Sequence, residues 1–349
     1  MNWMIYGANG YTGKLIAEEA VNRGMTPVLA GRSNSVTELA GSLGLQSRVF
    51  SLDHNSSKQL EDMSLVLHCA GPFSATAEPM MQACLKSRTH YLDITGEIAV
   101  FELAQSLADP ARDSGIVICP GVGFDVIPTD CVAATLKERM VDASQLALGF
   151  DSRSGLSRGT AKTSVEGLST GGRIRKDGKL TQVPLAYRTR TIDFGDGEKL
   201  GMTIPWGDVA TAYYTTGIPN IETYIAVSSQ LPKRMRRLNL IRPILGLGIV
   251  QNLLKAQVEK RVTGPTPEQR RRNAMYVWGE VSNGRETLTG RLKTANGYDV
   301  TVNGSLGIVQ NVLSTNRNGG AYTPSQLVGA AFAESLPGSE PIKLSHATA

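Results

Sequence analysis

A glycine-spaced segment near the start of the chain constrains its fold more than any other feature. Gly7-Ala-Asn-Gly10-Tyr-Thr-Gly13 follows an apolar run typical of a buried strand and precedes a helical pattern over residues 12–22. In this context, glycine turns present backbone N–H groups at a helix N-terminus to a pyrophosphate. A glycine-rich turn without a ligand is the alternative interpretation. The predicted nucleotide-binding residues of this turn are Gly7, Asn9, Gly10, Tyr11, Thr12 and Gly13.

Short apolar runs alternate with helical patterns through the first half of the chain. Each run ends at glycine, proline or a polar residue, as buried parallel strands do. The expected strands are residues 3–6, 27–30, 48–52, 65–69, 90–94 and 116–119, and the expected helices are residues 12–22, 35–43, 77–86 and 98–107. This alternation predicts a Rossmann-like, doubly wound parallel sheet of the α/β class.

The second half has a different texture from about residue 142. Polar and apolar residues alternate over longer runs, and hairpin dipeptides such as Asp177-Gly178 and Asn283-Gly284 separate them. The expected strands are residues 187–194, 222–227, 276–281 and 286–293, with helices over residues 161–169, 306–313 and 324–336. We therefore expect a first domain over residues 1–141, a second α+β domain with a mostly antiparallel sheet over residues 142–321, and a loose tail over residues 338–349.

The charge balance, the cysteines and the histidines argue against nucleic-acid binding, a disulfide framework and a metal site. The chain has 36 Lys and Arg against 31 Asp and Glu, a balance too even to indicate nucleic-acid binding without a concentrated patch. Its four cysteines form no C-x-x-C pair, which favours reduced thiols and a cytoplasmic location. No targeting segment is expected before the first strand. The four histidines lack metal-ligand spacing, so we predict no metal site.

The end of the second expected strand indicates which nucleotide the turn binds. An acidic residue there would bind the ribose 2′-hydroxyl of NAD, whereas Arg32, followed by Ser33, suits the 2′-phosphate of NADP. A solvated surface arginine is the alternative. Small residues after the fourth expected strand, Ala70, Gly71 and Pro72, would let the backbone run beside the cofactor. Asp53 follows the third expected strand, where adenine binding and a turn role are equally consistent with the sequence.

Several motifs together resemble the saccharopine dehydrogenase-like oxidoreductases. They are G-A-N-G-Y-T-G, A-G-R-S, H-C-A-G-P-F, H-Y-L-D-I-T-G-E and P-G-V-G-F-D-V-I-P-T-D. Later pieces, G-L-S-R-G-T-A, I-R-K-D-G-K-L, G-P-T-P-E-Q-R and T-P-S-Q-L, are similar to the trans-acting enoyl reductase branch. The resemblance implies that a C-terminal helix over residues 322–337 completes the nucleotide domain. It leaves the substrate open.

Hydride transfer from a bound nicotinamide also needs a proton source. Candidate acids follow the fifth and sixth expected strands, and we single out Asp125, Glu97 and Tyr91. Each has a structural alternative, because Tyr91 can face the core and Asp125 can cap the next helix. Ser157 and Thr160 precede a helical pattern and are expected to bind a polar substrate group or to cap that helix.

A basic cluster directly precedes an apolar stretch over residues 233–254. Lys233, Arg234, Arg236 and Arg237 form the cluster, and the stretch is too short and too interrupted to span a bilayer. The pattern is that of a peripheral anchor at the inner face of a membrane. A buried helix or a homodimer contact is the alternative.

These features predict an NADP(H)-dependent oxidoreductase, with NADP(H) preferred over NAD(H). The expected reaction is reduction of a C=C, C=N or C=O bond in a small-molecule, acyl or lipid-like substrate. A non-catalytic NADP(H)-binding sensor or a membrane-associated interaction protein is the alternative, because a cofactor fold does not by itself imply catalysis.

Overall fold

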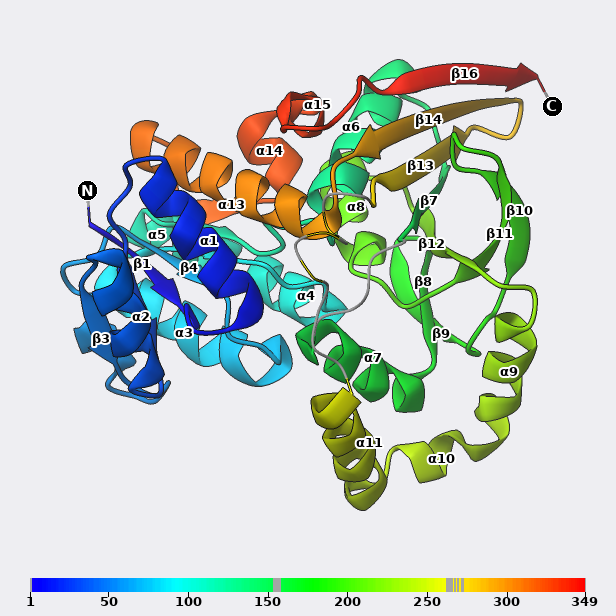
Figure 1. The fold of residues 1–349 in the computed structure, drawn as a ribbon. Coiled ribbons are helices and arrows are strands. Elements are labelled where there is room, and N and C mark those ends of the chain that lie inside the picture. Colours follow the sequence, from blue (N-terminus) through cyan, green and yellow to red (C-terminus); the bar gives the residue numbers. More distant parts are fainter. Residues whose placement is uncertain are drawn as a thin grey trace. The chain divides into compact units, whose positions relative to one another are not determined.

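The chain divides into two compact units (Figure 1). The computed structural model describes residues 2–152, 158–261, 266, 268, 270 and 273–348. The first unit comprises Met1–Ile127 and Tyr298–Gly329, and the second comprises Pro128–Gly297 and Ala330–Ala349. These bounds differ from the predicted domains 1–141 and 142–321. The late segment that rejoins the first unit cannot be read from local pattern, because its helix packs against residues nearly 300 positions earlier.

The first unit consists of strands and helices in near-perfect alternation. Its elements are β1 (Trp3–Tyr6), α1 (Tyr11–Asn22), β2 (Val28–Gly31), α2 (Ser35–Leu43), β3 (Ser47–Val49), the 3-10 helix η1 (Ser56–Gln59), β4 (Leu65–His68), α3 (Phe73–Ser87), β5 (His90–Asp93), α4 (Ile98–Ser106), α5 (Ala108–Ser114), β6 (Val117–Cys119), α13 (Gly297–Ser314), β15 (Gly320–Ala321) and α14 (Pro324–Val328).

All strand pairs of this unit are parallel, in the order β15-β6-β5-β4-β1-β2-β3. The order reverses beside β1, as in a doubly wound Rossmann-like sheet, so the predicted fold class is confirmed. Met4, Tyr6 and Val66 of the strands are buried and form a core cluster with apolar residues of α3 and α4. Because the strands are parallel, the loops that follow them gather at one edge of the sheet.

Helix α13 brings a late part of the chain to the start of the first unit. It lies beside α1 (Figure 1), where the Tyr298 ring contacts the Tyr11 ring edge-on at 5.1 Å between centroids. Arg23, at the end of α1, donates a hydrogen bond to the Asn303 side chain. The predicted helix over residues 306–313 is therefore the second half of a longer helix in the first unit.

The second unit is built on a larger sheet. Its elements are α6 (Ile127–Arg139), β7 (Gln145–Asp151), α7 (Arg158–Thr170), β8 (Gly172–Lys176), β9 (Lys179–Val183), β10 (Thr189–Asp193), β11 (Glu198–Thr203), α8 (Asp208–Thr216), β12 (Asn220–Val227), α9 (Leu231–Leu238), the 3-10 helix η2 (Asn239–Ile241), α10 (Arg242–Leu245), α11 (Gly248–Arg261), β13 (Met275–Ser282), β14 (Glu286–Thr294), α15 (Phe332–Ser335) and β16 (Lys343–Thr348).

The second sheet has the order β10-β11-β12-β7-β13-β14-β16, with β8 and β9 branching from β12. Its pairs are antiparallel apart from β12 with β7, so the sheet is mixed and mostly antiparallel, as predicted. An aromatic cluster that includes Phe194, Tyr224 and Trp278 packs on one face of it. The long β13–β14 hairpin turns at Asn283-Gly284, where Gly284 has a φ of +88°.

The C-terminal segment differs from the sequence prediction in two ways. The expected helix over residues 324–336 is two short helices, because α14 ends at Gly329, where φ is +87°, and Arg317 donates a hydrogen bond to the Leu327 carbonyl at its end. Helix α14 belongs to the first unit and α15 to the second. The expected loose tail is wrong for Lys343–Thr348, which form β16 and pair with the edge strand β14.

Candidate functional site

The glycine turn joins β1 to α1 at the edge where the parallel strands end. Gly7 has a φ of +85°, and a Cβ there would lie 2.7 Å from the Ala70 nitrogen, so only glycine fits. A Cβ on Gly13 would lie 2.3 Å from the Gly7 carbonyl oxygen, which explains the tight approach of helix and turn. Gly10 is the N-cap residue of α1 and contributes no capping side chain. The first turn of α1 also contains no acidic residue, and this composition suits a phosphate at the helix start.

Hydrogen bonds tie this turn to the end of β2. The Gly7 and Ala8 amides donate to the Ala30 carbonyl at 2.7 and 3.2 Å. The Asn9 side-chain amide donates to the Ser33 and Ser35 hydroxyls at 3.2 and 2.8 Å. Asn9 therefore fixes the glycine turn against the start of α2.

Arg32 stands in this same exposed corner. Arg32, Ser33 and Ser35 are all exposed, and the two serine hydroxyls lie 2.8 Å apart. Burial raises the pKa of Tyr6, and the nearby positive charge of Arg32 partly opposes that rise. The guanidinium and two hydroxyls beside a helix start form a cluster of donors that suits a phosphate group.

The loop after β4 approaches the glycine turn from its other side. Ala70 abuts Gly7, and the Thr76 hydroxyl donates to the Ala70 carbonyl at 2.7 Å. His68 is fully buried at the end of β4, with its Nε2 3.0 Å from the Thr76 hydroxyl. Burial lowers the pKa of His68 to about 3, so the ring is neutral at physiological pH. These contacts hold Ala70, Gly71 and Pro72 along the sheet edge.

Glu97 caps helix α3. Its Oε1 accepts a hydrogen bond from the Phe73 amide at 3.0 Å, and its Oε2 accepts one from the Ser74 amide at 2.7 Å. A carboxylate at a helix N-terminus is stabilised both by these bonds and by the helix dipole. The geometry therefore gives Glu97 a positioning role in the loop after β4, and its predicted role as an acid stays a prediction.

Tyr91 lies in the core of the first unit. It is fully buried on β5, and its hydroxyl donates to Asp93 Oδ2 at 2.6 Å. Asp93 Oδ1 accepts from the Thr95 and Gly121 amides, both at 2.9 Å, and so joins the loops after β5 and β6. Burial raises the pKa of Asp93 to about 6 against the lowering effect of these hydrogen bonds. Tyr91 thus supports Asp93, and its predicted role as a proton donor stays a prediction.

Asp125 lies in the loop after β6, at the sheet edge that carries the glycine turn. Its Oδ2 would be 3.0 Å from a Cβ on Gly96, so the carboxyl packs directly against the loop after β5. Burial raises the pKa of Asp125 to about 7, and its predicted role as an acid stays a prediction. The Phe124 amide, next to it, donates to the Thr301 hydroxyl at 2.9 Å, so α13 holds this loop in place.

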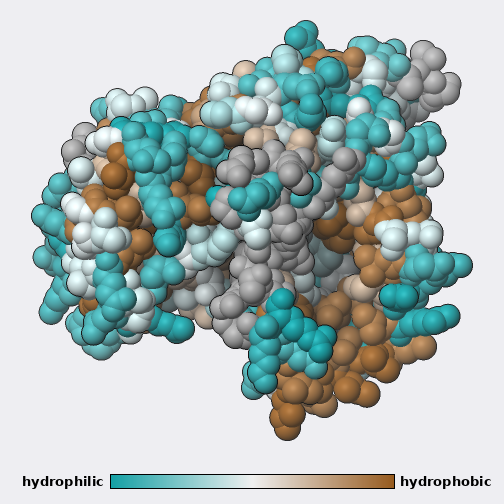
Figure 2. Space-filling model, viewed as in Figure 1, coloured by the Kyte–Doolittle hydropathy of each residue, from teal (hydrophilic) through white to brown (hydrophobic). Residues whose placement is uncertain are grey.

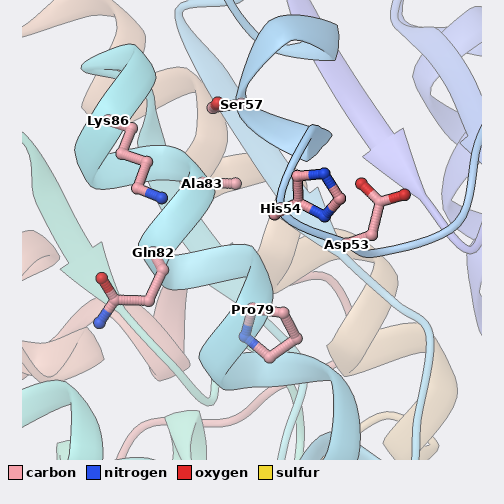
Figure 3. Close-up of a pocket in the computed structure, with 7 residues that line it drawn as sticks. All are labelled: Asp53, His54, Ser57, Pro79, Gln82, Ala83 and Lys86. Carbon is pink, nitrogen blue, oxygen red and sulfur yellow. The ribbon is translucent and has the colours of Figure 1, made fainter.

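Asp53 forms the turn that the sequence offered as its alternative role. Its Oδ1 accepts a hydrogen bond from the Asn55 amide at 2.8 Å, and its amide donates to the Ser56 hydroxyl. Figure 3 shows Asp53 and His54 facing the side of α3 across a pocket of about 240 Å³. The pocket is lined by Asp53, His54, Ser57, Pro79, Gln82, Ala83 and Lys86. An adenine-binding role for Asp53 stays a prediction.

The substrate-binding roles of Ser157 and Thr160 stay predictions. Ser157 lies outside the described residues, and Thr160 lies in the first turn of α7. Within the described part of the chain, no group of three or more His, Cys, Asp or Glu side chains is arranged to hold a metal ion.

Three residues of this region were not singled out by sequence analysis. Ser35 was expected only as the first residue of a helix, although it shares the Asn9 side chain with Ser33. Tyr298 and Thr301 come from α13, far along the chain, and contact Tyr11 and the Asp125 loop. The segment A-G-R-S-N-S over residues 30–35 places two serines close to Arg32, and this pattern could have identified Ser35. No local pattern marks the two α13 residues.

Residues 3–119 match the family model described as the saccharopine dehydrogenase NADP binding domain. A trans-acting enoyl reductase from Mycobacterium tuberculosis is 31% identical over 57% of this chain and 51% of its own length. A human saccharopine dehydrogenase-like oxidoreductase is 28% identical over 50% of this chain and 47% of its own. The chain thus spans about half the length of the curated relatives it matches.

Among solved structures, yeast saccharopine dehydrogenase is similar with a TM-score of 0.64 at 13% identity, covering 99% of this chain and 100% of that one. At this identity the likeness concerns the fold alone. Together with the sequence matches, it confirms the resemblance that the motifs predicted.

Proposed function

Because residues 3–119 match the family model of the saccharopine dehydrogenase NADP binding domain, we propose that the chain is an NADPH-dependent reductase of acyl substrates. When bound, NADPH supplies a hydride. The residues of this chain hold the dinucleotide, orient it and deliver the proton. The reaction we favour is reduction of a C=C bond adjacent to a thioester. Reduction of a C=N or C=O bond is the alternative, and the same assay tests it.

The observation that carries the proposal is the juxtaposition of two kinds of group at one sheet edge. The uncapped start of α1 and the Arg32–Ser33–Ser35 corner offer donors for two phosphate groups and are linked by Asn9. Asp125, with a pKa of about 7, follows β6 in the same parallel sheet. A phosphate cradle and a titratable acid at the carboxyl ends of parallel strands support a dinucleotide-dependent reaction there.

Asp125 is the proton donor in this proposal. Of the three predicted acids, Glu97 is held by two backbone amides and Tyr91 is buried against Asp93. A carboxyl with a pKa near 7 is protonated in a large fraction of molecules at neutral pH and can protonate the carbon or heteroatom opposite the incoming hydride.

The preference for an enoyl substrate rests on the M. tuberculosis relative, whose name describes an enoyl reductase. The match covers only about half of that relative, so we transfer its activity to this chain as a hypothesis. An α,β-unsaturated thioester is electrophilic at its β-carbon, where a hydride can add, and its α-carbon then takes the proton. Asp125 is assigned that second step.

The test is a NADPH-oxidation assay with a panel of enoyl-thioester, imine and carbonyl compounds. We expect turnover with at least one enoyl thioester and a large loss in Asp125→Asn. Asp113→Asn, an exposed carboxylate on α5, serves as the matched control and should retain full activity. Saturable NADPH binding without turnover on any compound would contradict the proposal and favour the cofactor-sensor alternative.

A further inference from the structure

The helical segment over residues 231–261 presents an apolar surface to solvent. We call this segment, which runs from α9 to α11, the arm. Its exposed large apolar residues are Leu240, Ile241, Ile244, Leu247, Ile249 and Leu253, with Leu240 85% and Ile249 86% exposed. Figure 2 shows hydrophobic residues gathered over α10 and α11 at the bottom of the view. Single exposed apolar residues are ordinary, but six within fourteen positions mark an interaction surface.

Three polar residues of the arm hold it against the rest of the second unit. Asn239 exchanges hydrogen bonds with the Leu185 backbone, at 2.8 Å from the amide and 3.2 Å to the carbonyl. Gln251 donates to the Val165 carbonyl at 3.2 Å, and Lys255 pairs with Glu166 of α7 at 2.6 Å.

These polar contacts fix the orientation of the arm. Large exposed leucine and isoleucine side chains on a segment held in this way are not what a surface helix usually presents to water. The exposed apolar residues of the arm are therefore accessible to a separate binding partner.

The arm is also strongly basic. Between Ser228 and Arg261 the sequence has eight Lys or Arg and one acidic residue, Glu259. Lys233, Arg234 and Arg237 of α9 are exposed, and the exposed apolar residues begin directly after α9 in the chain. Two copies of the chain that met through their arms would bring two positive segments together, which is unfavourable. Charge complementarity favours an anionic partner instead.

We propose that the arm docks the protein on the surface of an anionic lipid bilayer. The apolar residues of η2, α10 and α11 enter the headgroup and upper acyl region, while the α9 cations contact lipid phosphates and carboxylates. None of the described helices is long and apolar enough to cross a membrane. The attachment is peripheral, and it does not depend on the proposed reaction.

Vesicle co-sedimentation of the full chain tests the docking. Vesicles of phosphatidylcholine alone are compared with vesicles that also contain phosphatidylserine, at low and high salt. We expect binding to the anionic vesicles only, and a steep loss at high salt because the Debye length falls from about 10 Å at 0.1 M to about 3 Å at 1 M.

Two variants separate the charged from the apolar contribution. Each Lys or Arg near an anionic surface favours binding about fivefold, so Lys233→Gln, Arg234→Gln and Arg237→Gln together should weaken it about a hundredfold. Arg236 is kept because it donates to the Ala186 carbonyl at 3.1 Å. Lys176→Gln, Lys179→Gln and Arg285→Gln, exposed residues of the same unit, form the matched charge control.

The apolar variant combines Leu240→Ser, Ile249→Ser and Leu253→Ser, and should weaken binding roughly tenfold or more even at low salt. Its control is Val141→Ser, because Val141 is 73% exposed and lies outside the arm. Thermal unfolding and NADPH binding are measured on every variant and should be unchanged.

Several results would overturn the docking. They are absence of parent binding to the anionic vesicles at low salt, and equal losses in the arm variants and their controls. A parent dimer that becomes monomeric in the apolar variant, without vesicle binding, would overturn it in favour of a subunit interface.

Discussion

Replacing Arg32 with alanine should remove most of the preference of this protein for NADPH over NADH. Arg32 is exposed at the end of β2, beside two serine hydroxyls that Asn9 holds in place. A hydrogen bond to a charged group contributes about 1.5 to 3 kcal/mol, which corresponds to about a tenfold to 150-fold change in a dissociation constant. NADH has no 2′-phosphate, so its affinity should change little.

Isothermal titration of parent, Arg32→Ala and Arg112→Ala with both cofactors measures this directly. Arg112 is an exposed arginine on α5 that forms an ion pair with the neighbouring Asp109, so its variant reports the loss of one surface charge. The expected loss is confined to NADPH and to Arg32→Ala. Equal dissociation constants for the two cofactors in the parent would refute the reasoning, and so would an equal loss for both cofactors in Arg32→Ala.

Three further substitutions probe the rest of the edge. Gly10→Val should abolish NADPH binding, because the valine side chain enters the space expected for the phosphates, and calorimetry measures this loss. The melting temperature should change little in thermal unfolding, because a Cβ at Gly10 meets only the Gly7 carbonyl oxygen, at 3.2 Å. The reaction rate of the parent should fall as pH rises through about 7, because Asp125 loses its proton there. Asp125→Asn should lose activity, and its residual rate should no longer fall in this pH range. Glu97→Ala should lower the free energy of unfolding by about 1 to 2 kcal/mol through loss of the α3 cap, with Glu97→Gln losing less in denaturant titrations.

The parts of the site that sequence predicted are those encoded by neighbouring residues. The glycine turn, the arginine after β2 and the small residues after β4 all lie within a few positions of a strand end, and strand, turn and helix signals agree there. Periodicity likewise predicted the parallel sheet and the mostly antiparallel one. These features depend on local conformation and on the alternation of buried and exposed positions.

The parts that sequence missed depend on contacts between distant residues. Glu97 caps a helix that begins 24 positions earlier, and no pattern near Glu97 reveals that contact. Thr301 supports the Asp125 loop from 177 positions away, and no pattern near either residue reveals the pairing. Residues 343–348 were expected to be part of a loose tail. They form β16 by pairing with the edge strand β14, and the short sequence of β16 does not reveal that partner.

Transfer of deuterium from NADPH that carries deuterium at both C4 positions of the nicotinamide tests the central claim most directly. The parent protein is incubated with the labelled cofactor and the enoyl thioester that gives turnover, and the product is analysed by mass spectrometry. We predict one deuterium per product at the β-carbon, with transfer strongly reduced in Asp125→Asn and retained in Asp113→Asn. A product without deuterium, or no product from any enoyl, imine or carbonyl compound despite saturable NADPH binding, would contradict the assignment as a reductase.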